Sequence, residues 1–227
     1  MRVRSIISGV VVACFLVSGG PLFAKKKPWD VERYAGCLKA SGSDPLAPDQ
    51  TITSQGCNGG RNSVDASEGA PSDLKAITFV TGARNKDNQA LAFVAIAFGT
   101  RFDRVSTYVG GARLTSDNGG GLGFGSVFAM VGGRRQELTV SAHENAAPDC
   151  SFMSRGSIGA TTCTFAEVGV VQLPIALLDE LSKAYATDPT SLFRFRVATK
   201  TGSITFSVPV AEIEAVRRSI FPPAAAG

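Results

Sequence analysis

The spacing of the cysteines constrains the fold of this chain more than any other feature. Four of the five cysteines form two sequence-local couples, Cys37 with Cys57 and Cys150 with Cys163, while Cys14 lies in an apolar N-terminal stretch. A zinc site needs ligands roughly two to five residues apart or added histidines, and the chain has one histidine. A redox pair needs a Cys-x-x-Cys motif, which neither couple provides. The pattern therefore favours two disulfides, each closing a short loop, over a redox or metal site.

The N-terminus predicts export to an oxidising compartment, where disulfides persist. Residues 1–24 begin with two arginines, continue as an apolar run and end at Ala24, which is typical of a cleaved signal peptide. Two alternatives stay open. The run Ser5–Ala24 is long enough for an uncleaved membrane anchor, and Cys14 follows a lipobox-like sequence that would allow lipidation. We expect a periplasmic or secreted protein, for which an uncleaved or lipidated N-terminus would be the only contact with a membrane, if there is any contact at all.

Composition and charge exclude several classes of protein. The chain is 44% hydrophobic and 19% charged, which is ordinary for a globular protein and unlike a disordered one. Residues 1–24 hold two arginines and no acid, so without them the 23 basic residues fall to 21, against 19 acidic residues. These basic residues are scattered and form no stripe with aromatic residues, so we expect no nucleic-acid partner. No pattern calls for a cofactor.

The body of the chain divides into two segments of different pattern. Residues 25–73 are rich in turn-forming residues, which predicts an irregular N-terminal arm with the first disulfide and a short helix within 31–40. The run ALAFVAIAFG at 90–99 is apolar on both faces and predicts a central strand covered on both sides. Further strands are expected in KAITFVTG (75–82), RVSTYVGGARL (104–114), SVFAMVGG (126–133), QELTVSAH (136–143) and TFAEVGVVQL (164–173).

The last third predicts a helix, a hairpin and a second helix. Pro174 precedes a run with apolar residues at helical spacing. Residues 192–209 alternate apolar and polar residues on both sides of a TKTG turn, and residues 211–220 form a second amphipathic run before a disordered tail at 222–227. The predicted fold class is α+β and strand-dominated. It is an antiparallel sheet or sandwich over residues 74–221, closed by two C-terminal helices.

A glycine-rich stretch, DNGGGLGFGS at 117–126, is the most conspicuous motif. Glycine-rich turns can hold an anion with backbone N–H groups, but the spacing here matches neither the dinucleotide-binding nor the P-loop pattern. The stretch predicts a hairpin loop, with a ligand cradle as the alternative. In the second case the contact residues would be Gly119, Gly120, Gly121 and Gly123.

No set of residues identifies a catalytic centre. His143 is the only histidine, and RGSIG at 155–159 lacks the glycine that a nucleophile elbow requires. Glu137, Glu144 and Glu167 lie on separate strand-like segments without any sign that they converge. We therefore assign no catalytic or metal-binding residue, and His143 is kept as a possible contact residue.

Two arginines mark a possible binding face. Strand alternation places Arg194 and Arg196 on one face of the predicted hairpin, opposite Phe193 and Phe195. Such a pair could meet an anionic partner, or it could belong to a solvated sheet face.

One family resemblance concerns the last third of the chain. The order of a cysteine couple (Cys150 and Cys163), the helix LLDELSKAYA, the hairpin KTGSITFSVPV and the helix AEIEAVRRSI is similar to secreted invasion-associated locus B proteins of bacteria. The cysteine spacing is longer than in that family, and its aromatic-ended closing motif is missing. The resemblance implies an envelope protein without catalysis.

These observations lead to three functional hypotheses. The first is an exported bacterial-type envelope protein that acts as a non-catalytic binding or structural module, with an envelope protein or glycan as partner. The second is an envelope-acting hydrolase that uses His143 with an acid supplied by the fold. The third is a membrane-anchored assembly factor.

Overall fold

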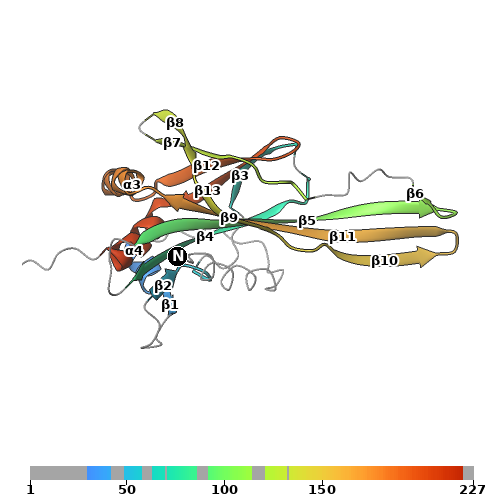
Figure 1. Ribbon diagram of the computed structural model, residues 1–227, viewed down its shortest axis with the longest axis horizontal. Helices are drawn as coiled ribbons and strands as arrows, with labels where there is room; N and C mark the ends of the chain where they lie inside the picture. The colour runs from blue at the N-terminus through green and yellow to red at the C-terminus, as the bar shows by residue number, and fades with distance from the viewer. Residues whose placement is uncertain are drawn as a thin grey trace, which may run out of the picture.

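The computed structural model describes residues 30–41, 49–57, 63–69, 71–85, 92–113, 121–131 and 133–221. Two antiparallel sheets make up most of the described chain, and two helices from its C-terminal third lie at one end (Figure 1). The predicted α+β, strand-dominated class is confirmed. The predicted signal peptide at 1–24, the tail at 222–227 and two of the candidate glycines, Gly119 and Gly120, lie outside the described residues.

The larger sheet has eight strands in the order β1-β2-β4-β5-β11-β10, with β6 paired to β5 and β9 paired to β11. The two longest strands, β5 and β11, run side by side through the whole sheet. Together the strands are β1 (Lys39–Ser41), β2 (Asp49–Thr53), β4 (Lys75–Asn85), β5 (Phe93–Val109), β6 (Ala112–Arg113), β9 (Val140–Asn145), β10 (Asp149–Arg155) and β11 (Ile158–Leu173).

The smaller sheet has five strands in the order β3-β13-β12-β7-β8. The predicted C-terminal hairpin forms its centre, with Phe195 opposite Phe206 in the register. The strands are β3 (Val64–Glu68), β7 (Val127–Val131), β8 (Arg134–Leu138), β12 (Leu192–Ala198) and β13 (Ser203–Pro209).

The core lies between the two sheets and centres on Phe98. Its ring packs at 5.5 Å from Phe195 and 5.2 Å from Phe206, both of which come from the smaller sheet. Residues 94–98 of β5 are all at most 1% exposed. This burial confirms the predicted central strand that is covered on both faces, and it explains why the strand carries no polar residue there.

Three helices complete the described fold: α2 (Val31–Ala35), α3 (Ile175–Thr187) and α4 (Val210–Ile220). Both C-terminal helices follow a proline, Pro174 and Pro209, whose fixed φ suits a helix start. Helix α4 packs closely on the larger sheet, because a Cβ at Gly82 of β4 would lie only 2.5 Å from Ile220 Cγ1. No helix of the described segments has the length and apolar character that crossing a bilayer requires.

The N-terminal arm differs from the sequence prediction. The sequence predicts an irregular segment over 25–73, whereas the described part of it contributes β1, β2 and β3 to the two sheets. The helix within 31–40 is shorter than expected, since it ends at Ala35. Strands β2 and β3 obtain their hydrogen bonds from β4 and β13, which are distant in sequence, so the local apolar pattern that signals an independent strand is not needed.

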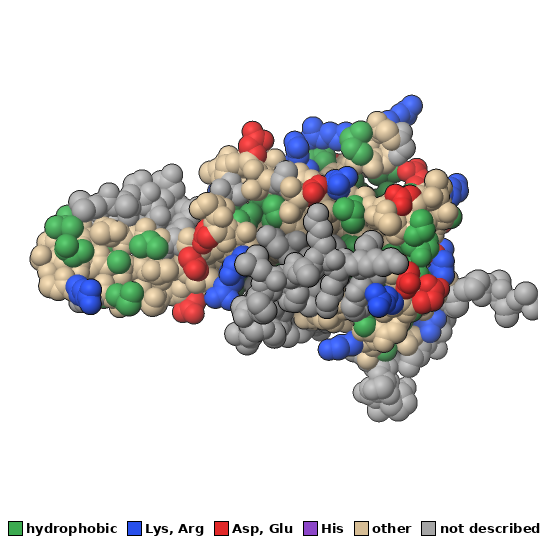
Figure 2. Space-filling model, turned by 180° about the vertical axis from the view of Figure 1, so that it is seen from behind, with side chains coloured by type: hydrophobic (Ala, Val, Ile, Leu, Met, Phe, Trp, Pro, Cys, Tyr) green, Lys and Arg blue, Asp and Glu red, His purple; other side chains and the backbone are tan. Residues whose placement is uncertain are grey.

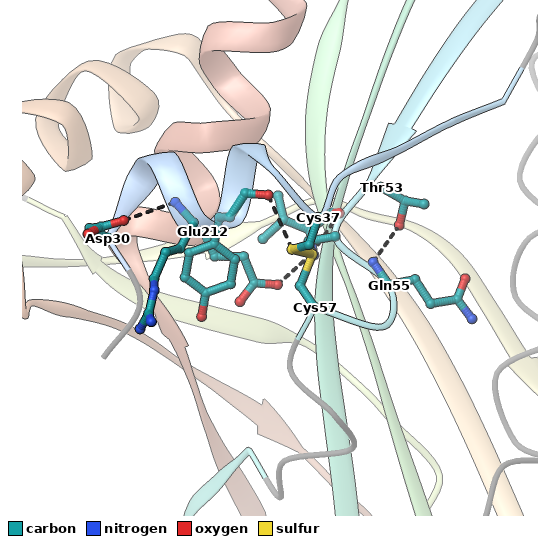
Figure 3. Close-up of a disulfide and its surroundings, with 10 residues drawn as sticks. Asp30, Cys37, Thr53, Gln55, Cys57 and Glu212 are labelled. Carbon is teal, nitrogen blue, oxygen red and sulfur yellow. Dashed lines mark hydrogen bonds between the residues drawn. A yellow bond between two sulfur atoms is a disulfide. The ribbon is translucent and has the colours of Figure 1, made fainter. Parts of the chain in front are cut away.

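Both predicted disulfides are present. Cys37 and Cys57 have Cα atoms 5.6 Å apart, and Cys150 and Cys163 have Cα atoms 4.0 Å apart. The first disulfide joins the turn after α2 to the turn after β2, and it lies beside the buried Glu212 of α4 (Figure 3). It therefore fastens the N-terminal segment to the core.

The second disulfide braces a projection that the sequence pattern did not predict. Beyond the sandwich, β5 and β11 continue as paired strands and are joined by β6 and β10, so that the larger sheet extends far past the smaller one (Figure 1). We call residues 103–113 and 149–164 the β-finger. The predicted hairpin CSFMSRGSIGATTC, residues 150–163, forms half of it.

Candidate functional site

The outer face of the smaller sheet carries the candidate arginines. The exposure of β12 alternates, with Phe193, Phe195 and Val197 buried and the intervening arginines exposed. Arg196 lies opposite Thr205 of β13 and opposite Phe128 of β7 in the register. The predicted orientation of Arg194 and Arg196 on one face is therefore observed.

The two arginines border a surface cavity of about 340 Å³. Met130 of β7, which is 62% exposed, contributes an apolar side chain to the lining of this cavity. The lining residues are Phe128, Ala129, Met130, Arg135, Arg194, Phe195, Arg196 and Thr205. We call this set the sheet-face site.

Cations outnumber anions at the sheet-face site. Its lining includes three arginines and no acid. The Arg135 guanidinium lies 3.8 Å from the centre of the Phe128 ring, which holds it in a cation–π contact. Arg194 Nε donates to Asp65 Oδ2, and this ion pair is exposed on both sides, so it neutralises only part of the charge.

This arrangement suits a ligand with an anionic group and an apolar part. A guanidinium offers a planar fork of N–H donors that matches a carboxylate or phosphate. Because stacking on Phe128 restricts the Arg135 side chain, less rotamer entropy is lost when the guanidinium binds an anion. Phe128 and Met130 supply apolar surface beside the charges.

Among the lining residues that sequence reasoning missed, Phe128, Met130 and Arg135 supply the exposed apolar surface and the third cation. The signal was present in SVFAMVGGRR, where Phe128 and Met130 alternate with buried Val127 and Ala129. Pairing with β12 brings this segment beside Arg196. The pairing is non-local and cannot be read from the sequence pattern.

The glycine-rich stretch holds a carboxylate of the protein itself. Gly123 N donates to both oxygens of Glu167 at 3.0 Å, and Phe124 N donates to Oε2 at 3.3 Å. A Cβ at Gly121 would lie 1.7 Å from Glu167 Oε1, so only glycine fits there. Gly123 has a φ of +63°, which also favours glycine. The described part of the stretch is thus an anion cradle that is occupied by Glu167.

His143 lies beside the same carboxylate without a hydrogen bond to it. His143 Nε2 is 3.9 Å from Glu167 Oε2, and its ring packs 5.6 Å from that of Phe124. The imidazole is 32% exposed, while Glu167 is 1% exposed. The Thr100 hydroxyl is buried on the neighbouring strand, opposite Glu167 in the register, and has no hydrogen-bond partner within the described structure.

The chemistry available around His143 is limited. The Glu167 oxygens accept backbone N–H groups, so they are not directed at the imidazole at hydrogen-bond distance. Sequence reasoning did not predict the contact between Glu167 and the glycine-rich stretch. The available signal was a glutamate within the otherwise apolar stretch FAEVGVV, residues 165–171, of a predicted strand.

Within the described segments, no group of three or more His, Cys, Asp or Glu side chains is placed to hold a metal ion. No protein family, curated protein or solved structure matches the chain. The resemblance of its last third to invasion-associated locus B proteins therefore stays a prediction.

Proposed function

We propose that this protein is a non-catalytic envelope protein that binds an acidic glycan at the sheet-face site. The supporting observation is the cavity on which Arg135, Arg194 and Arg196 converge beside Phe128 and Met130. Carboxylate groups of a uronic-acid polymer would pair with the guanidinium groups, and its sugar rings would lie on the apolar side chains.

A location outside the cytoplasm belongs to the same proposal. Two disulfides fit an oxidising compartment. The N-terminal segment predicts the export route, and the periplasm or the cell exterior is where such a protein would meet envelope glycans.

The binding role is better supported than the hydrolase alternative. A histidine base needs a carboxylate that accepts a hydrogen bond from the imidazole and orients it, and the Glu167 carboxylate lies 3.9 Å from His143 Nε2 and accepts from Gly123 and Phe124 instead. At the sheet-face site, in contrast, all three arginines are exposed, and the carboxylate that pairs with Arg194 is itself 38% exposed.

The test is titration of the oxidised full-length protein with oligogalacturonate, with the methyl-esterified oligomer as the uncharged control. We expect binding of the acid and not of the ester, weakening as salt rises. Arg194→Ala/Arg196→Ala removes two exposed cations, and at about 0.7 kcal/mol each we expect roughly tenfold weaker binding. Arg101→Ala removes an exposed arginine from the other sheet and should leave the affinity unchanged. Equal binding of acid and ester, or an unaltered affinity of the double variant, would refute the proposal.

A further inference from the structure

The β-finger projects from the end of the sandwich opposite α3 and α4 (Figure 1). The paired strands of the finger run in continuous register from Asp103 to Val109 and from Ile158 to Thr164. At a rise of about 3.3 Å per residue, these seven-residue stretches reach roughly 20 Å beyond the body. The Cys150–Cys163 disulfide ties β10 to β11 near the base, so the finger is held as a rigid three-stranded ribbon.

Large apolar side chains are exposed along the finger, and most of them lie between its midpoint, where Phe152 pairs with Thr161, and its tip, where Ile158 pairs with Val109; Val105, nearer the base, is 53% exposed. Met153 is 75% exposed, Phe152 64%, Ile158 54% and Val109 42%. Hydrophobic side chains are seen along the finger in Figure 2. Soluble surfaces carry scattered apolar residues, but four large ones in the outer half of one projection indicate a surface that is covered in use.

These apolar residues lie on both faces of the ribbon. Val109 and Ile158 are register partners and share one face, on which Met153 also lies through its pairing with Ala160. Phe152 lies on the other face, where its ring contacts that of Tyr108 across Gly159. A flat partner docked on one face would leave the other apolar face in water.

Of the charged residues of the finger, Arg113 and Arg155 belong to its outer half, whereas Arg104, Asp103 and Asp149 belong to its base. The segments 104–113 and 150–163 contain three arginines and no acid. Arg155 lies exposed at the tip, paired in register with Ile158. The acids Asp103 and Asp149 flank Thr164 in the register at the base of the finger. Figure 2 shows acidic side chains gathered where the finger joins the body.

We propose that the tip of the β-finger inserts into the surface of a membrane that contains anionic lipid. An apolar tip with side chains on both faces suits the hydrocarbon boundary, because that medium surrounds the tip on every side. Arginine at the same depth meets anionic headgroups, and the acids at the base stay in water away from them. The proposal rests on the envelope location proposed above but not on the glycan site. It adds a membrane contact that the sequence assigned to the N-terminus alone.

The test is co-sedimentation of the oxidised protein with vesicles of phosphatidylcholine alone or with added phosphatidylglycerol. We expect binding to the anionic vesicles, and a Met153→Ser/Ile158→Ser variant should bind at least tenfold more weakly. The matched control is Ile175→Ser/Leu192→Ser, because these two residues are large and apolar, are 66% and 40% exposed, and lie outside both the finger and the sheet-face site. The control should sediment like the unchanged protein.

A second variant tests the charge. Each basic residue near an anionic surface contributes roughly a fivefold gain in binding, so Arg155→Gln should lower binding to anionic vesicles by about that factor. Its binding to neutral vesicles should not change.

Three outcomes would overturn the proposal. They are no sedimentation of the unchanged protein, equal loss in the tip and control variants, or a protein that self-associates through the tip without binding vesicles. Arg194→Ala/Arg196→Ala should sediment normally, so failure of the glycan proposal is distinguishable from failure of this one.

Discussion

A carboxylate that joins the two C-terminal helices offers a quantitative test of the fold. Glu214 of α4 has a side chain that is only 5% exposed, and it accepts hydrogen bonds from three partners. Arg217 Nε and Arg218 Nε each lie 2.8 Å from its oxygens, and the Ser182 hydroxyl of α3 donates to Oε2. The perturbation is Glu214→Gln, which keeps the shape of the side chain and removes its charge.

The magnitude follows from the pKa of Glu214. Burial alone would raise that pKa, but hydrogen bonds from Arg217, Ser182 and Arg218 outweigh it and lower the pKa from 4.5 to about 2. Because the folded-state pKa lies below the unfolded value, the ionised carboxylate stabilises the fold above pH 4.5. That contribution is lost as the pH falls from 4.5 towards 2. A shift of this size corresponds to at most about 3 kcal/mol.

The assay is urea unfolding of the oxidised protein, followed by circular dichroism at pH 7, 4 and 2.5. We expect Glu214→Gln to lower the free energy of unfolding by about 2–3 kcal/mol at pH 7 and by less than about 1 kcal/mol at pH 2.5. Glu32→Gln is the matched control. Glu32 faces the same Arg218 at 3.8 Å, but it is 78% exposed, so its loss should cost almost nothing. The reasoning fails if the cost of Glu214→Gln is equal at both extremes of pH, or if it matches the control.

Two further predictions concern the core and the β-finger. A Cβ at Gly169 would lie 2.3 Å from Cζ of the enclosed Phe98 ring, so Gly169→Ala should cost about 1–3 kcal/mol in urea unfolding. Gly125→Ala meets no atom closer than 3.7 Å and serves as the control; equal costs would contradict this account of the packing. Replacing both Cys150 and Cys163 by serine should lower the free energy of opening the finger by about 3 kcal/mol. Faster hydrogen exchange of the β10 amides would show this loss, and unchanged exchange would contradict it.

The strongest local patterns of the sequence were sufficient for much of the fold. The hairpin at 192–209 was predicted from alternation and forms β12 and β13, because its two strands are adjacent in sequence and joined by a short turn. Helix α3 follows Pro174 as expected, and α4 covers the run at 211–220 that was predicted to be helical. Strands β1, β2 and β3 were missed, since they lie at or near sheet edges and are stabilised by partners far away in sequence.

The sheet-face site was only half predictable. Alternation within one strand placed Arg194 and Arg196 on one face, and the structure agrees. The rest of the site comes from β7 and β8, whose position beside β12 depends on the register of non-local pairs. The link between Glu167 and Gly123 is of the same kind, because no sequence motif connects a strand to a loop more than forty residues away.

The β-finger shows how a change of pattern within one strand marks the end of the core. From Val94 to Phe98 every residue of β5 is buried, as expected for a strand between two layers. Beyond Phe102 polar and charged residues enter the same strand, and its valines are exposed, Val105 to 53% and Val109 to 42%. A segment of strand that leaves the sandwich no longer needs apolar residues on both faces to stay folded. The large apolar side chains in the outer half of the β-finger, especially Met153 of β10, are therefore better explained by the proposed contact with a membrane surface than by packing within the chain.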